Sequence, residues 1–452
     1  MSELQAGINT TLRRGRGRWR NWSGVVRATP QDIVQPRGEA QLAELLATTA
    51  RSAERVRAVG AGHSFTALAA TEGVLVNLDR MQGLVGVDPA ARRVTLAGGT
   101  RLRKIPNLLR PHGVALPNQG DVDPQSITGA INTGTHGTGV GYTGFAGLVR
   151  GFRIALASGE IRQAHPDAPD KLDRDLFHYG RIGLGALGIV TQVDMDVAPS
   201  FVLAAREHAE PVADITRNFP NRVHAADHVE FYWFPGTDVA HVKTNTRHPA
   251  DHPTQPISPL KAAIEDELLN NVVFGAMCNL ATVLPRTTGP LARLGAATLA
   301  QREYSDLAHD VFVSSRRVRF NEMEYAIDLE DAPEVLAEVQ RTMNTCDQRV
   351  LFPIEVRAAA ADDVPLSTAK GRTTCYIAVH RFHRDDYRAL FRHIEPILKA
   401  AGGRPHWGKI HTCTHEELLE RHADLPAVAE LRAQVDPTGV FRNGEVDRIF
   451  GL

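Results

Sequence analysis

Three glycine-rich segments in the first 190 residues constrain the fold of this chain more than any other feature. Gly60-Ala61-Gly62-His63-Ser64 follows a predicted strand, residues 129–139 hold four glycines, and residues 183–188 hold three glycines before another predicted strand. Glycine lets the backbone turn sharply and approach a ligand closely, and the N–H groups of such turns bind anions. Three such segments in one domain predict a ligand of dinucleotide size that is held by loops.

The first glycine segment does not match the Rossmann fingerprint. That pattern requires a third glycine three residues after the second, whereas the chain has Phe65 at this position. Taken alone, the turn at residues 60–64 is as compatible with a structural role as with ligand binding. Residues 129–139 have a poor composition for a helix or a strand, which favours a loop that cradles an anion over a simple linker.

Charge and hydropathy exclude several classes of protein. The 452 residues include 51 lysines and arginines against 52 aspartates and glutamates, whereas binding to duplex phosphates usually needs a basic excess. Hydrophobic residues make up 43% of the chain, which is typical of globular proteins. The chain lacks an apolar run of about 18 residues. We therefore expect no nucleic-acid partner and no transmembrane segment.

Cysteine spacing and the N-terminus predict a cytoplasmic location. The four cysteines lie far apart without a Cys-x-x-Cys pair, which fits reduced thiols better than a disulfide framework. Arg13, Arg14 and Arg16 are followed by Trp19 and Trp22, where a signal peptide would place its apolar run. We interpret the basic N-terminus as a frayed leader.

Alternating short elements predict an α+β organisation in three parts. We expect a ligand-binding domain over residues 1–199, ordered from about residue 21, a second domain over residues 200–415, and a tail over residues 416–452. The predicted strands span residues 55–59, 74–78, 85–87, 94–96, 149–157, 189–197, 229–233 and 311–320. The predicted helices span residues 38–53, 101–110, 260–269, 332–345 and 427–434.

Two polar motifs in the second domain are candidates for chemistry. Glu355 and Arg357 are two apart on a strand-like run, so both side chains point to one face. A surface ion pair is the alternative explanation. His406-Trp407-Gly408-Lys409 gathers an imidazole, an indole and a cation around a glycine, and a loop with a packed tryptophan is the alternative.

A metal site is the competing interpretation of a nearby cluster. His411, Cys413 and His415 lie within five residues, and two histidines four apart share a helical face in some metalloproteases. However, Thr412 and Thr414 make this run strand-like, and no acidic base is interposed. A metal-dependent hydrolase would explain only this cluster, so we predict no bound metal.

Together these motifs resemble the vanillyl-alcohol-oxidase superfamily of flavoproteins, specifically its aldonolactone oxidoreductase branch. The resemblance covers residues 21–452. Residues 57–65 are similar to the pyrophosphate loop of the branch, residues 116–121 and 126–137 to its second flavin loop, and residues 352–357, 375–380 and 404–409 to its substrate-side signatures.

The resemblance implies an α+β fold with bound FAD. A two-subdomain FAD-binding domain of the PCMH/VAO type would be followed by an α+β cap domain for the substrate, and the tail would return to the FAD domain. The flavin would be attached covalently through His63. The implied cofactor-binding residues are Val59, Gly60, Ala61, Gly62, His63, Ser64, Phe65, Gly120, Asp121, Ser126, Ile127, Gly129, Thr133, Gly134, His136, Gly137, Gly188, Val190, His406, Lys409 and Asn443.

The resemblance also implies an activity. We expect oxidation of a CH–OH group on an aldono-1,4-lactone of the L-gulono or D-arabinono type, by hydride transfer to flavin N5. Glu355 would bind substrate hydroxyls, Arg357 and Lys409 would stabilise charge, and His380 is a further catalytic candidate. The alternatives are an alditol or polyol oxidase that produces hydrogen peroxide and, from another class, a flavin-free sugar-binding protein.

The electron acceptor is either oxygen or a cytochrome- or quinone-type partner. Gly120 stands where related dehydrogenases carry alanine, a methyl group that obstructs oxygen, so the resemblance implies an open path. Asp121 stands where alditol oxidases carry serine. If Asp121 stays ionised, its charge would disfavour a developing superoxide.

Overall fold

The computed structural model describes residues 17–297, 301–314 and 316–452. Arg13, Arg14 and Arg16, the basic leader predicted from the sequence, lie outside the described residues. Within the described ranges, no helix is both long enough and apolar enough to cross a bilayer.

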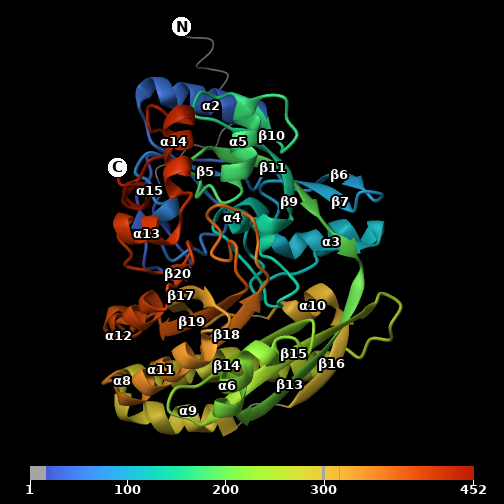
Figure 1. Cartoon of the computed structure of the whole chain (residues 1–452), viewed down its shortest axis with the longest axis vertical. Coiled ribbons are helices and arrows are strands. Elements are labelled where there is room, and N and C mark those ends of the chain that lie inside the picture. Colours follow the sequence, from blue (N-terminus) through green and yellow to red (C-terminus); the bar gives the residue numbers. More distant parts are fainter. Residues whose placement is uncertain (1–16, 298–300, 315) are drawn as a thin grey trace.

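The N-terminal part contains two main sheets (Figure 1). A three-stranded parallel sheet has the order β3-β5-β4, and a five-stranded antiparallel sheet has the order β10-β9-β11-β7-β6. The strands are β1 Trp19–Arg20, β2 Arg27–Ala28, β3 Asp32–Val34, β4 Val56–Val59, β5 Val74–Asn77, β6 Leu84–Asp88, β7 Arg93–Ala97, β8 Val114–Ala115, β9 Val149–Ala155, β10 Ile161–Ala164, β11 Ile189–Asp196 and β12 Ala198–Pro199. The helices are α2 Glu39–Ser52, α3 Ile105–Leu109, α4 Ile127–Asn132 and α5 Lys171–Gly180.

An eight-stranded antiparallel sheet forms the lower half of Figure 1. Its order is β16-β13-β15-β14-β18-β19-β17-β20. The strands are β13 Phe201–Pro211, β14 His228–Trp233, β15 Val239–Pro249, β16 Arg302–Leu307, β17 Phe320–Asp328, β18 Ile354–Ala359, β19 Thr374–Phe382 and β20 Arg404–Pro405. The helices are α6 Val212–Arg222, α7 Pro259–Ala262, α8 Phe274–Val283, α9 Thr288–Ala297, α10 Ala308–Phe312, α11 Ala332–Thr345 and α12 Tyr387–Ala400, with a π-helical turn series over Ala263–Val273.

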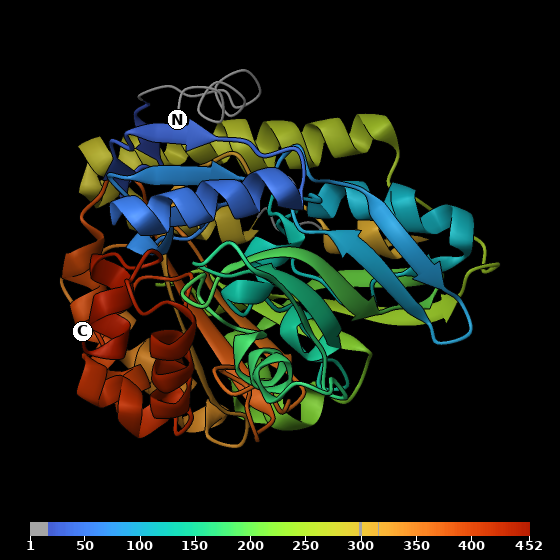
Figure 2. The ribbon, with the colours of Figure 1, turned by 90° about the horizontal axis from the view of Figure 1, so that it is seen from above.

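The chain ends with three helices that lie beside the N-terminal part, drawn in red in Figures 1 and 2. They are α13 His415–Arg421, α14 Leu425–Val435 and α15 Gly444–Phe450. Val440 and Phe441 of this tail join a buried apolar cluster with Leu42 and Leu46 of α2 and Val76 of β5. Burial of these side chains attaches the tail to the parallel sheet.

Several predicted elements are confirmed at nearly the expected bounds. The helix expected over residues 332–345 is α11, in which Val335, Leu336, Val339 and Met343 are buried at helical spacing. The helix expected over residues 38–53 is α2. Such elements are well predicted because one face packs on the core and the other meets solvent.

Other predictions about local structure are wrong. Among the described residues between 311 and 320, the expected strand is absent: α10 ends at Phe312, and the strand β17 begins only at Phe320. Residues 410–414 are not assigned to a strand, although the Ile410 N–H donates to the Glu322 carbonyl of β17 at 2.9 Å. The helix α13 begins directly after them with a capping box between Thr414 and Glu417. The apolar alternation that suggested strands is too short to compete with these helix signals.

The second glycine segment is only partly a loop. Its first residues belong to the helix α4, whose N-cap is Ser126, with Oγ accepting from the Gly129 N–H at 3.3 Å. Ile127, Ala130 and Ile131 are buried in the core. The cap and this burial together outweigh the low helix propensity of glycine.

Candidate active site

Two neighbouring cavities share lining residues: one lies within the N-terminal part, and the other lies between that part and the eight-stranded sheet. The smaller, which we call the glycine-lined cavity, measures about 120 Å³, and the larger, the charged cavity, measures about 570 Å³. His63, Ser64, Gln125 and Thr133 line both. An elongated ligand can therefore occupy both cavities at once, with His63 at their junction.

Backbone rather than side chains forms much of the glycine-lined cavity. Gly62, Gly185 and Gly188 line it with φ values of +69°, +63° and +154°, a region that favours glycine. A Cβ added to Gly60 would lie 2.3 Å from Ser126 Oγ. The loops therefore approach one another as closely as the sequence predicted, and their backbone fits the diphosphate of a dinucleotide.

A buried arginine that sequence analysis did not single out holds these loops together. Arg57 is 2% exposed, and its guanidinium donates to the carbonyls of Leu68, Leu184, Gly185 and Phe441 at 2.6–2.7 Å. Burial lowers the pKa of Arg57 to about 10, against the effect of Asp436, so the group stays charged at neutral pH. One side chain thus joins the first and third glycine segments to the C-terminal tail.

Three neighbouring strands supply one wall of the charged cavity. Glu322 and Glu324 alternate with apolar residues on β17, Glu355 and Arg357 do the same on β18, and His380 lies on β19 directly opposite Glu322. Period-two alternation places each pair on one face of its strand. Loops supply the remaining charged or imidazole side chains, which are His63, Asp121, Asp123, His136, Arg316, His406 and Lys409.

Arg357 lies at the centre of a cluster of carboxylates. It contacts Glu355, donates from Nε to Glu230 Oε2 at 2.8 Å, and lies 3.3 Å from Asp121 Oδ1 through Nη2. Arg316 Nε donates to the other oxygen of Asp121 at 2.7 Å. Glu355 and Arg357 are 7% and 8% exposed, so the alternative explanation of a surface ion pair is wrong.

The pKa values of two carboxyl groups in this cluster, Glu355 and Asp121, are shifted in opposite directions. Burial raises the pKa of Glu355, and Arg357 compensates only in part. Burial also opposes ionisation of Asp121, but Arg316 and Arg357 outweigh it and hold the pKa of Asp121 well below its usual range. Asp121 is therefore an ion paired with two arginines, whereas Glu355 takes up a proton more readily than an ordinary glutamate.

Lys409 and His380 meet at a second carboxylate, Glu322. Lys409 Nζ contacts Glu322 and lies 3.9 Å from Glu324 Oε2. His380 Nε2 lies 3.5 Å from Glu322 Oε1 and 3.8 Å from Glu355 Oε2. Burial opposes ionisation of Glu322, yet Lys409 and His380 lower its pKa to about 2. Glu322 thus keeps Lys409 charged and links it to His380.

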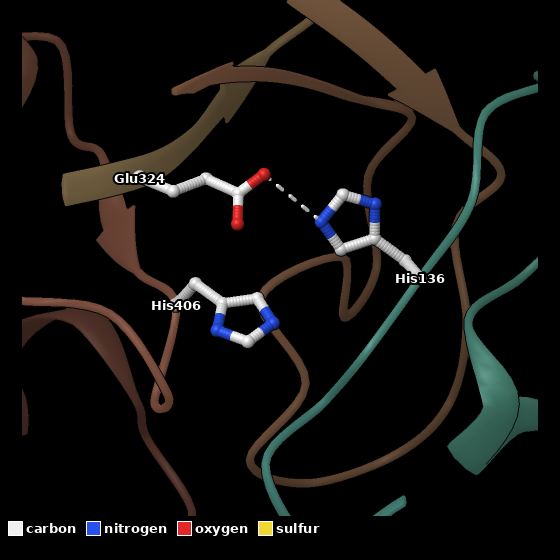
Figure 3. Close-up of side chains that lie close together, drawn as sticks. All are labelled: His136, Glu324 and His406. Atoms are coloured by element: carbon white, nitrogen blue, oxygen red, sulfur yellow. Dashed lines mark ion pairs between the residues drawn. The ribbon is translucent and has the colours of Figure 1, made fainter. Parts of the chain in front are cut away.

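Figure 3 shows a group of two histidines and a glutamate, which are His136, His406 and Glu324. His136 Nε2 is 3.3 Å from Glu324 Oε1, and His406 Nδ1 accepts from a backbone N–H at 3.0 Å. Their ligand atoms lie within 4.8 Å of one another, a composition that suits a metal ion. Because Lys409 already supplies a cation next to Glu324, we do not propose a metal here.

Most residues that the sequence implicated in flavin binding line one of the two cavities. In the glycine-lined cavity they are Val59, Gly60, Ala61, Gly62, His63, Ser64, Ser126, Gly129, Thr133, Gly188 and Val190. In the charged cavity they are His63, Ser64, Phe65, Gly120, Asp121, Thr133, His136, His406 and Lys409. The expected catalytic residues Glu355, Arg357, His380 and Lys409 also line the charged cavity.

Four of the predicted residues are not among those that line either cavity: Ile127, Gly134, Gly137 and Asn443. Ile127 is fully buried in the core. Asn443 caps α15, and its amide donates to three carbonyls between Ala67 and Ala70. Asn443 therefore stabilises the segment Ala67–Ala70, which follows His63 in the chain.

The His411, Cys413 and His415 side chains do not converge. His415 Nδ1 lies 2.9 Å from the Ile449 carbonyl, His411 Nε2 lies 3.2 Å from an Nη atom of Arg448, and Cys413 Sγ lies 3.3 Å from a tyrosine hydroxyl. Each side chain has a different partner, which does not support the hydrolase alternative.

Sequence analysis did not identify several residues that line or support the charged cavity. Glu322 and Glu324 sit in a run that alternates apolar and acidic residues, a signal that was present but not used. Glu230 and Arg316 carry no local signal, because the β14–β18 pairing brings Glu230 to Arg357 and a distant loop brings Arg316 to Asp121.

The fold and the two cavities, together with the family models that match the chain, define an FAD-binding oxidoreductase. A solved structure of cholesterol oxidase from B. sterolicum shares the fold, with a TM-score of 0.79 at 15% identity over 97% of each chain. A family model described as an FAD binding domain matches residues 30–165, and one described as D-arabinono-1,4-lactone oxidase matches residues 193–449.

Sequence relatives point to the same family. An L-gulono-1,4-lactone dehydrogenase of Mycobacterium tuberculosis is 38% identical over 433 residues, covering 96% of this chain and 99% of the relative. An L-gulonolactone oxidase of Mus musculus is 27% identical over 442 residues, covering 96% and 98%. The chain belongs to the D-arabinono-1,4-lactone oxidase family, which confirms the resemblance, the fold class and the assignment as an FAD-dependent enzyme.

Proposed function

We propose that the protein oxidises a CH–OH group of an aldono-1,4-lactone of the L-gulono or D-arabinono type. The observation that carries this proposal is the row of charged and imidazole side chains along one wall of the charged cavity, from Lys409 through Glu322, His380 and Glu355 to Arg357. A row of donors and acceptors suits a substrate with hydroxyls on successive carbons. The names of the relatives support a lactone.

The chain's own residues bind and orient this substrate. When bound, FAD supplies the redox chemistry by accepting a hydride. Glu355 accepts hydrogen bonds from substrate hydroxyls. Arg357 and Lys409 lower the energy of negative charge that develops as the hydroxyl loses its proton, and Glu322 holds Lys409 and His380 in place for this role.

The substrate class is tested by turnover with an artificial acceptor. We expect faster turnover of L-gulono- or D-arabinono-1,4-lactone than of a five-carbon alditol at equal concentration. Preference for the alditol would support the polyol oxidase alternative instead. The family matches already rule against the flavin-free sugar-binding alternative.

We also propose that the flavin is covalently attached through His63. This side chain lies at the junction of the two cavities and stacks on Trp22 at 5.2 Å. Burial and, next, Lys409 lower its pKa to about 4. At neutral pH the imidazole therefore keeps a free lone pair, which bond formation requires.

Acid precipitation should leave a yellow pellet from the wild-type protein and a colourless pellet from His63→Ala. Ser64→Ala is the matched control, because it lines the same cavities but keeps the imidazole, and it should give a yellow pellet. A colourless wild-type pellet with all flavin in the supernatant would defeat the covalent proposal but not the FAD assignment.

Oxygen is the acceptor that we propose, with a cytochrome- or quinone-type partner as the alternative. A Cβ added to Gly120 would lie 3.0 Å from the His136 carbonyl and 4.0 Å from Arg357 Nη1, at the wall of the charged cavity. Asp121 is ionised, but Arg316 and Arg357 neutralise it. The expected electrostatic obstacle to superoxide is therefore smaller than the sequence alone implied.

Gly120→Ala should slow reoxidation of the reduced flavin in aerated buffer, while anaerobic reduction by lactone changes little. The measurement is stopped-flow absorbance of the flavin. Gly141→Ala is the control, since a Cβ there meets no atom within 4 Å. Wild-type flavin that stays reduced for many minutes in air would support the cytochrome- or quinone-type acceptor.

We propose the domain limits 1–199, 200–415 and 416–452. The sheets support these limits. The last strand of the five-stranded sheet in the sequence is β11, which ends at Asp196, and the first strand of the eight-stranded sheet in the sequence is β13, which begins at Phe201. A cytoplasmic location is likewise a proposal, supported by four free cysteines.

A further inference from the structure

One helical segment carries most of the exposed large apolar side chains among the described residues. Ten of the twelve lie between residues 260 and 294, in the segment from α7 to α9 that we call the apolar helical segment. Leu260, Val272 and Val283 are 73%, 63% and 75% exposed. Apolar surface gathered in this way marks an interaction site rather than ordinary scatter.

This segment is apolar on its inner side as well. Phe274, Met277 and Ala281 pack against the core, and Cys278 is buried. Residues 268–285 contain no charged side chain. A helix that is hydrophobic all round is normally covered on all sides, yet Figures 1 and 2 show α8 and α9 at the edge of the molecule.

A basic rim borders the segment. Two adjoining surface hollows are lined by six arginines and only two aspartates: Arg20, Arg27, Arg317, Arg319, Arg384, Arg388, Asp385 and Asp386. Val272 lines one hollow together with Arg384, which also donates to Asn279 of α8 at 2.7 Å. The rim therefore touches the apolar surface directly.

Two arginines near the beginning of the described residues lie at this rim. Arg20 and Arg27 line the same hollow as Arg388, and the sequence before them adds Arg13, Arg14 and Arg16. A cluster of arginines next to exposed apolar helix combines the two features that bind anionic lipid surfaces, namely charge attraction and apolar insertion.

We propose that the apolar helical segment and its arginine rim dock the protein on an anionic membrane surface. The apolar side chains enter the headgroup boundary, and the arginines contact lipid phosphates. A second copy of this chain suits the surface less well, because a symmetric contact would bring one arginine rim against the other.

Vesicle flotation of the full-length holoprotein tests the insertion. We expect binding to vesicles of phosphatidylcholine and phosphatidylglycerol in equal parts. The triple variant Leu260→Ser, Val272→Ser, Val283→Ser should weaken vesicle partitioning by about tenfold or more, with unchanged flavin content and turnover of a soluble dye. Val85→Ser is the matched control, an exposed valine (54%) outside the segment, and it should bind like wild type.

A second set of variants tests the contribution of the arginine rim to vesicle binding. The variant Arg20→Gln, Arg27→Gln, Arg388→Gln should lose on the order of a hundredfold in binding to the anionic vesicles, whereas Arg206→Gln, an exposed arginine on β13, should not. High salt should release wild-type protein. Absence of flotation, equal binding of the apolar triple variant, or a dimer that the triple variant abolishes without any vesicle binding would each overturn the proposal.

Discussion

Replacing Arg357 by leucine, or Lys409 by methionine, is expected to slow flavin reduction by a lactone about 10²–10³-fold. Arg357 contacts Glu355 and lies near Asp121, and Lys409 contacts Glu322, all within the charged cavity. Without these cations, charge developing on the substrate is no longer stabilised. The measurement is the rate of flavin bleaching after anaerobic mixing.

Loss of a buried cation also leaves carboxylates unpaired, which can destabilise the fold. The effect on the rate of flavin reduction must therefore be separated from an effect on stability. Flavin content and the denaturation midpoint serve this purpose, and Arg357→Lys should recover part of the rate. Arg341→Ala removes an arginine from an exposed pair with Glu338 and should change neither rate nor stability measurably. Reduction at the wild-type rate in Arg357→Leu would assign the residue a structural role.

Arg57→Met is expected to lower the free energy of unfolding by roughly 3–5 kcal/mol. Four buried carbonyls would lose their donor, and the first and third glycine segments would lose their shared support. We expect a lower urea midpoint together with loss of bound flavin. Arg51→Met, on the exposed side of α2, is the control, and equal midpoints for the two variants would contradict this account of Arg57.

The sequence predicted the fold well where local chemistry decides it. The turn at residues 60–64 and the helix α11 follow from glycine placement and from apolar spacing. The helix α4 was missed because glycine lowers the helix propensity of this run and the burial of Ile127, which supports the helix, is visible only in three dimensions. Propensity is a weak guide wherever tertiary packing overrides it.

The candidate site was predicted unevenly for the same reason. Glu355 and Arg357 are two residues apart on one strand, so the sequence predicted that their side chains point to the same face. Glu230 reaches Arg357 across the β14–β18 pairing, 127 residues away in the chain. Arg316 approaches Asp121 from a loop 195 residues distant. No local pattern specifies contacts of that separation.

Anaerobic mixing of the purified holoprotein with L-gulono-1,4-lactone or D-arabinono-1,4-lactone tests whether the protein oxidises a lactone through its flavin. We expect a yellow protein whose visible flavin absorbance is bleached by at least one of these lactones, with one equivalent of lactone consumed per flavin. Persistence of the oxidised flavin spectrum with both lactones at high concentration, in protein with full flavin content, would contradict this expectation.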